Sequence, residues 1–162
     1  MRTKTTKLLR FVFVALVAAG AVGCGSPYVV DRQFAAGALT PRSRWKASGP
    51  LKDPAKALDG NDTTAAVSEP YYNDVALTID LGEVCVLNMI TIDHGPDEMG
   101  FCIRIAAETS LDGENFVRRA EAPGTRRATF ISMVTPVLAR YVRLKVVAQG
   151  EKPWSVAEVH LQ

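Results

Sequence analysis

Short runs of alternating apolar and polar residues recur along the chain from about residue 75 onward. Such alternation is typical of strands with one buried face, and a helical period of 3.6 residues is nearly absent. Turn signals separate the runs, among them Gly82 and the pair Asp112–Gly113. Many short strands in one domain predict an all-β fold, an antiparallel β-sandwich or jelly roll. The runs are VALTIDL (75–81), VLNMITID (86–93), CIRIAAET (102–109), ATFISMV (128–134), RYVRLKVV (140–147) and VAEVHL (156–161).

The first 23 residues have the pattern of an export signal. Arg2, Lys4, Lys7 and Arg10 form a basic start, and LLRFVFVALVAAGAVG supplies an apolar segment too short for a span of ~20 residues. The segment ends in AVGC, which resembles the lipobox of bacterial lipoproteins. That resemblance implies cleavage before Cys24 and lipidation of its sulfur. The alternative is an ordinary secretory signal that is cleaved nearby.

A lipidated cysteine predicts an exported protein of the bacterial cell envelope that is anchored to a membrane. Acyl chains contribute membrane affinity of ~0.8 kcal/mol per buried CH₂. Gly25, not aspartate, follows the cysteine, and by the sorting habit of enteric bacteria this favours the outer membrane or cell surface. We expect residues 1–23 to be the signal peptide, residues 24–44 the lipidated cysteine and tether, and residues 45–162 one folded domain.

Removing the predicted signal changes the electrostatic character of the chain. The signal holds four of the 19 Lys and Arg residues and none of the 17 Asp and Glu residues. The remaining chain therefore has 15 basic and 17 acidic residues, a net charge of −2. A basic footprint is what nucleic-acid binding needs, so the composition favours no nucleic-acid partner.

Cys85 and Cys102 are the two cysteines that remain after Cys24. In an exported protein an even pair favours a disulfide between them, and the alternative is two separate buried thiols. The sequence contains no CxxC motif or Cys/His cluster that would indicate zinc.

Five motifs then follow one another in a recognisable order: KALDGNDTT, LTIDLGEV, SLDGENF, ARYVRLKV and SVAEVHL. In this order and spacing, the chain from about Trp45 to Gln162 resembles the discoidin or coagulation factor V/VIII C-terminal-type domain. That domain is a galactose-binding-like jelly roll, similar to the family-32 carbohydrate-binding modules. The resemblance covers essentially the whole predicted domain and implies its fold.

The same resemblance implies a structural calcium ion in the KALDG loop. Six positions match the expected ligands: the Lys56 carbonyl, Asp59, Asn61, the Thr64 hydroxyl and carbonyl, the Ala157 carbonyl, and Glu158. Ca²⁺ takes six to eight hard oxygen ligands, and glycine lets such a loop fold tightly. Related domains often have aspartate in place of Asn61 and tryptophan in place of Ala66, and a lost charge weakens Ca²⁺ binding. The alternative is an Asx-type turn without an ion.

A second set of residues lies in three loops that we expect at one end of the sandwich, where such folds bind ligands. Aromatic faces pack against the C–H side of a sugar ring, and polar groups bind its hydroxyls. For each residue the alternative is a structural role, such as closing the end of the core. The candidate ligand-binding residues are Tyr71, Tyr72, Asn73, His94, Asp97 and Trp154, in the loops SEPYYND, HGPDEMG and AQGEKPW, together with Arg104 on the polar face of its strand.

These features favour a non-catalytic carbohydrate-binding module that binds a glycan or polysaccharide through its loops. The alternative is an envelope protein–protein interaction or assembly module without a sugar site. An enzyme is the third class, but the sequence has no GxSxG, HExxH or phosphate-loop motif. We therefore predict no catalytic residues.

Overall fold

The computed structural model describes residues 38–70 and 74–162, and almost all of its regular structure is β-strand. Every strand pairing in it is antiparallel. The strands are β1 (Lys46–Ser48), β2 (Leu51–Lys52), β3 (Ala66–Ser68), β4 (Ala76–Asp93), β5 (Arg104–Ser110), β6 (Val117–Pro123), β7 (Ala128–Ala148), β8 (Ser155–Val156) and β9 (Glu158–Leu161), with two short 3-10 helices, η1 (Arg42–Arg44) and η2 (Pro54–Leu58).

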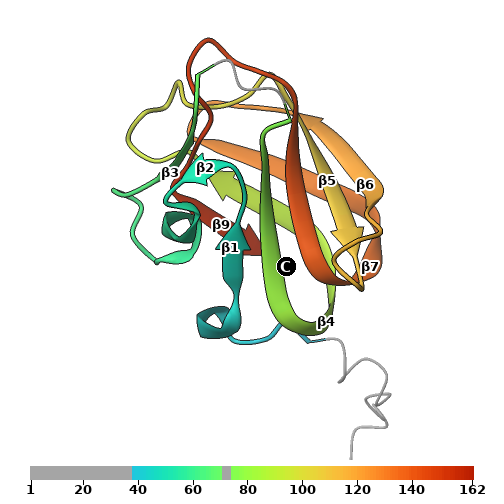
Figure 1. Ribbon diagram of the computed structural model, residues 1–162. Helices are drawn as coiled ribbons and strands as arrows, with labels where there is room; N and C mark the ends of the chain where they lie inside the picture. The colour runs from blue at the N-terminus through green and yellow to red at the C-terminus, as the bar shows by residue number, and fades with distance from the viewer. Residues whose placement is uncertain (1–37, 71–73) are drawn as a thin grey trace, which may run out of the picture.

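Two long strands, β4 and β7, run through both layers of the sandwich (Figure 1). The six-stranded sheet has the order β1-β4-β7-β5-β6, with β9 paired to β4 outside this path, and a separate three-stranded sheet has the order β2-β3-β8. β4 pairs with β7 in separate stretches, Ala76–Asp80 near one end and Met89–Asp93 near the other, with register shifts between them. The first stretch lies beside β1 and the second beside β9. The predicted antiparallel β-sandwich is confirmed.

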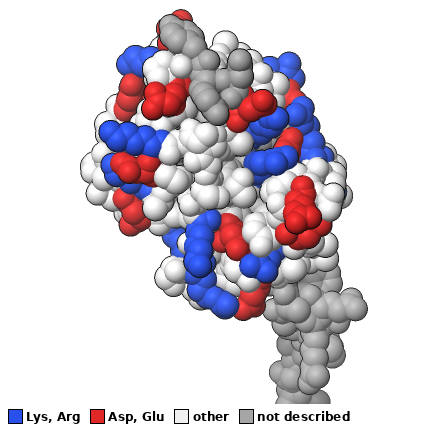
Figure 2. Space-filling model, viewed as in Figure 1, with Lys and Arg blue, Asp and Glu red and all other residues white. Residues whose placement is uncertain are grey.

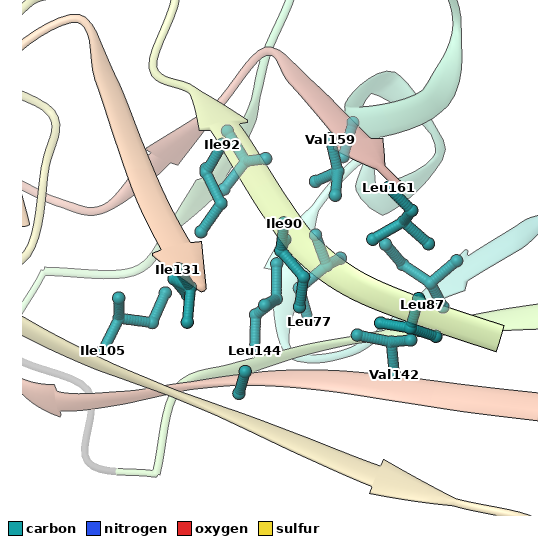
Figure 3. Close-up of a cluster of buried hydrophobic side chains, with 14 of the residues drawn as sticks. Leu77, Leu87, Ile90, Ile92, Ile105, Ile131, Val142, Leu144, Val159 and Leu161 are labelled. Carbon is teal, nitrogen blue, oxygen red and sulfur yellow. The ribbon is translucent and has the colours of Figure 1, made fainter. Parts of the chain in front are cut away.

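The hydrophobic core lies between the layers and is built from every second residue of the long strands. In β4, Leu77, Ile79 and Leu81 are buried in one half and Ile90 and Ile92 in the other. This is the alternation that a strand with one buried face requires. Figure 3 shows the side chains from both halves converging with those of β7 and β9. Burial at these positions fixes the register, because a slip of one residue would expose them.

The sequence runs differ from the observed strands in three ways. The run at 156–161 is divided between β8 and β9, which belong to different sheets. The runs at 75–81 and 86–93 form one bent strand, and so do those at 128–134 and 140–147. Alternation did not reveal β1, β2, β3 or β6. β6 lies at the sheet edge with its first three residues exposed, so it lacks the buried face on which alternation depends.

The described part of the predicted tether, residues 38–44, packs on the domain. The Thr40 hydroxyl donates a hydrogen bond to the Leu81 carbonyl at 2.5 Å, and the Trp45 indole N–H donates to the Thr40 carbonyl at 3.1 Å. The folded unit thus begins before Trp45. The predicted signal and Cys24 lie outside the described residues. Within residues 38–70 and 74–162, no helix is long and apolar enough to cross a membrane.

Cys85 and Cys102 are free and buried, which corrects the expected disulfide. Each packs separately in the hydrophobic core cluster. Burial raises the pKa of the Cys102 thiol to about 12, so this thiol stays protonated at neutral pH. A protonated, buried thiol is a poor nucleophile, so Cys102 has a packing role.

Candidate functional site

Loops gather at one end of the sandwich, at the top of Figure 1. The Ser155 N–H donates to the Gly100 carbonyl at 2.7 Å, and the Gly124 N–H donates to the Ile103 carbonyl at 2.9 Å. These backbone bonds tie the β4–β5 connection to the connections on either side of it. The loop end therefore has a fixed arrangement that the strands support.

His94 lies beneath these loops and is fully buried. Its Nδ1 lies 2.7 Å from the Ser155 carbonyl oxygen and its Nε2 lies 2.8 Å from the Thr129 hydroxyl. A carbonyl only accepts, so Nδ1 carries the proton and the neutral Nε2 accepts from Thr129. Burial lowers the pKa of His94, although its bond to Ser155 opposes this. Both ring nitrogens are used internally, so the expectation that His94 contacts a ligand is corrected.

A small pocket lies between the β3–β4 connection and residues 149–154. It has a volume of about 60 Å³, and its walls include Ser68, Val75, Gln149 and Trp154. This volume admits a few water molecules or one substituent of a sugar, but not a whole ring. A bound sugar would therefore rest on the rim with one group inserted.

Trp154 forms the buried wall of this pocket, with 3% of its surface exposed. Its backbone N–H donates to the Ser68 hydroxyl at 2.9 Å. The indole Nε1, however, is buried without a hydrogen-bond partner among the described residues. Such unpaired buried donors are rare and cost about 1–3 kcal/mol. The indole thus forms a wall of the pocket, while its Nε1 is enclosed by the protein.

A charged pair forms part of the rim. Lys152, from the pocket wall, donates to both carboxylate oxygens of Asp97 at 3.0 and 3.1 Å. This interaction lowers the pKa of Asp97 below its usual value, and a backbone bond from Met99 adds to the effect. Both side chains are half exposed, so their polar atoms remain accessible to a ligand.

The KALDG loop lies apart from this pocket, around η2 and β9. Asp59 accepts hydrogen bonds from the Asn61 N–H at 2.9 Å and from the Thr64 hydroxyl at 2.7 Å. Glu158 is buried, and one of its oxygens accepts from the N–H groups of Gly60 and Asn61. The loop thus closes as a network of side-chain acceptors and backbone donors.

The second Glu158 oxygen, Oε2, forms an ion pair with Arg42, with which a calcium ion at this carboxylate would compete, and it accepts no hydrogen bond among the described residues. The carboxylates that should face a cation already face N–H groups, a hydroxyl and a guanidinium. Within residues 38–70 and 74–162, no group of three or more His, Cys, Asp or Glu side chains is placed to hold a metal ion. Calcium binding stays a prediction of the resemblance alone.

The charged residues elsewhere on the domain are interspersed. Figure 2 shows Lys and Arg side chains beside Asp and Glu on one face, with no large area of a single sign. Arg143 pairs with Glu108 at 2.6 Å, and Lys145 pairs with Asp74 at 3.2 Å. This mixture favours no polyanion partner on that face.

The sequence model for the F5/8 type C domain matches residues 38–159. The chain belongs to this family. The match begins at residue 38, in agreement with the packing of Thr40 and Arg42 on the domain. The comparison with curated proteins gives no match.

Solved structures confirm the F5/8 type C fold. The module CpGH89CBM32-5 from Clostridium perfringens, in complex with GalNAc-β-1,3-galactose, is 20% identical with a TM-score of 0.68, covering 77% of this chain and 99% of that one. The family 32 CBM of C. perfringens NanJ, in complex with galactose, is 20% identical with a TM-score of 0.66, covering 75% and 95%. A family 89 glycoside hydrolase from C. perfringens is 23% identical with a TM-score of 0.60, covering 73% and 14%.

In this F5/8 type C domain, the loop end brings together only some of the predicted ligand residues. Trp154 lies in the pocket wall. Asp97 lies at the rim, where it accepts hydrogen bonds from Lys152, a residue of the pocket wall. Arg104 is outside the pocket lining and pairs instead with Glu121. The predicted Tyr71, Tyr72 and Asn73 lie outside the described residues.

Sequence reasoning missed Lys152 and Ser68. Lys152 lies in AQGEKPW, a loop that pattern analysis does single out, but nothing in the sequence shows that it pairs with Asp97 across 55 positions. Ser68 ends a short strand and meets Trp154 across 86 positions. No local signal could have found either contact.

The burial of His94 predicts a pH dependence of stability. Its pKa is lowered from 6.5 in the folded state, so below about pH 6.5 the unfolded chain takes up a proton that the folded chain excludes. We expect the unfolding temperature to fall as the pH is lowered from about 7.5 to about 5.5. The fall should be smaller in the His94→Gln variant, which lacks the imidazole. Thermal unfolding of both proteins at the two pH values measures this. An equal fall in both would exclude His94 as the cause.

Proposed function

We propose that this F5/8 type C domain is a non-catalytic carbohydrate-binding module that binds glycans at its loop end. The observation that carries the proposal is a small pocket at the loop end, which Trp154 walls and the half-exposed pair of Lys152 and Asp97 borders. A sugar hydroxyl or hydroxymethyl group has the size to enter it. Lys152 and Asp97 at the rim supply a donor and an acceptor for neighbouring hydroxyls.

Galactose is the first sugar to test, because two structural relatives have ligands that contain it. GalNAc-β-1,3-galactose and galactose are bound in the structures of these Clostridium perfringens modules. The identity is 20% in both cases, and fold alone does not establish specificity. The proposal therefore names galactose-type glycans as the ligand class.

We extend the proposal to the cell envelope on the basis of the N-terminal pattern. Cys24 after AVG would carry the lipid, and 13 residues would separate it from Ala38, the first described residue. The binding domain would then act at the outer membrane or cell surface and hold glycans close to the membrane.

The experiment is a glycan-array screen of residues 25–162, followed by calorimetric titration with the best glycan. Trp154→Phe keeps an aromatic ring in the pocket wall but is smaller than the indole, so it enlarges the pocket. We expect it to weaken binding about 5- to 10-fold and to lower the free energy of unfolding by about 1–3 kcal/mol, since Trp154 is 3% exposed. Lys152→Ala should also weaken binding, whereas Lys46→Ala, an exposed lysine on β1, should not. A blank array from a folded domain would exclude the tested glycans.

A second candidate function is docking of an envelope protein on the outer face of β7. Phe130 is 62% exposed and Val134 fully exposed on this strand, and aromatic and apolar side chains of this kind are typical of protein interfaces. A Phe130→Ser variant would keep glycan binding under the first function. Loss of an envelope complex in that variant, together with a blank array, would favour the second.

A further inference from the structure

The Arg42 side chain enters the KALDG loop from the N-terminal segment. Its Nη1 donates to the Val159 carbonyl at 2.9 Å, and its Nε and Nη2 lie 3.4 and 3.5 Å from the carbonyls of Leu58 and Ala57. The same guanidinium forms an ion pair with Glu158. One side chain thus contacts η2, where the loop begins, and β9, against which it packs.

The charges around this guanidinium are those that would surround a metal ion. Glu158 is 5% exposed, and a buried carboxylate needs a compensating charge. The charge of Asp59 acts on Arg42 and raises its pKa, although burial has the larger, opposite effect. Three backbone carbonyls complete the set of acceptors. Arginine keeps its charge in proteins, so it can fill this role permanently.

We propose that Arg42 is the resident cation of the KALDG loop, and that this domain holds the loop without a bound metal ion. The guanidinium pairs with the charge of Glu158 and contacts the carbonyls of Ala57, Leu58 and Val159 at the same time. A calcium ion at Glu158 would have to displace it. The proposal is independent of sugar binding, since none of these residues lines the pocket beside Trp154.

The contacts of Arg42 hold the N-terminal segment, residues 38–45, in place in the same way as they hold the loop. Arg42 lies in η1, and the Trp45 ring lies 5.8 Å from its guanidinium carbon. The cation is part of the chain and its position is preorganised by η1 and Trp45. Ordering the loop therefore depends on the folding of residues 38–45 and not on the calcium concentration.

The first test is thermal unfolding of residues 25–162 in about 10 mM calcium chloride and in excess EDTA. Calcium sites of extracellular modules have dissociation constants of about 10⁻⁴–10⁻³ M, so this concentration would saturate one. We expect unfolding temperatures that agree within about 1 °C. A rise of several degrees in calcium would overturn the proposal.

The second test replaces the cation. Arg42→Met keeps much of the side-chain length and leaves Glu158 buried without its partner, so we expect a fall of about 5 °C or more in unfolding temperature. The matched control is Arg44→Met, since Arg44 lies in the same η1 and forms an exposed pair with Glu83. The unfolding temperature of Arg44→Met should fall by less than about 2 °C. Equal falls in both variants would overturn the proposal.

A third variant covers the case in which Arg42→Met does not fold. Arg42→Lys keeps the charge but not the planar fork that reaches several acceptors at once. We expect an unfolding temperature below wild type that still does not respond to calcium. A lysine variant whose unfolding temperature rises by several degrees in calcium would overturn the proposal.

Discussion

Replacing Leu144 with alanine is expected to lower the free energy of unfolding by about 3–4 kcal/mol, within the range for buried leucines. Leu144 lies in β7, is fully buried, and pairs with Leu77 of β4. Its side chain points into the cluster of Figure 3. β7 has β4 on one side and β5 on the other, so the strand cannot move inward to fill the cavity. The cost should therefore approach that of an unrelaxed void.

The matched control for this prediction is Leu138→Ala, the same change in the same strand. Leu138 is 55% exposed, so its truncation should cost less than about 1 kcal/mol. Unfolding by guanidinium chloride, monitored by tryptophan fluorescence, gives both free energies. If the two variants lost equal stability, the buried face of β7 would not be the one that the structure shows.

Replacing Gly124 with alanine is expected to cost about 3 kcal/mol, the upper part of the range for an overpacked site. A Cβ at this position would lie 1.7 Å from the Cys102 carbonyl oxygen and 2.9 Å from its carbon. Both are backbone atoms, so no side chain can rotate away. The adjacent hydrogen bond from the Gly124 N–H to the Ile103 carbonyl, at 2.9 Å, would have to lengthen or break.

Gly60→Ala separates this steric effect from glycine's conformational freedom. Gly60 has φ +80°, but a Cβ there would meet nothing within 4 Å. Alanine should therefore be unfavourable only because of the left-handed backbone conformation, which lowers the free energy of unfolding by about 1 kcal/mol. The same denaturation measurement applies to both variants. A cost at Gly60 equal to that at Gly124 would show that the close approach to Cys102 is not what matters.

Much of the fold could be predicted because burial alternates within each half of the long strands. Leu77 and Ile90, from different runs of the sequence, lie on the buried face as alternation requires. The bend that joins the two runs in β4 could not be predicted, because Gly82 reads as a strand end. Only the pairing with β7, which continues past the bend with register shifts, makes the strand continuous.

The candidate site was less predictable, since its contacts join distant positions. The loop that contains Trp154 was singled out for its aromatic residue, and the pocket does lie there. His94 is a residue type that often contacts ligands, yet its two ring nitrogens are hydrogen-bonded to Ser155 and Thr129. Arg42 reaches Val159 across 117 positions, and no local pattern indicates such a contact.

The passage of β4 and β7 through both layers has a mechanical consequence. Where loops alone join two layers, one layer can open while the other persists. Here each layer contains a half of the same β4–β7 ladder, so opening one layer pulls directly on the pairing of the other. A load that enters the domain near Thr40 and Leu81 would be shared along this ladder. The two layers should then unfold together under force. The loop end would keep its arrangement until the whole domain unfolds.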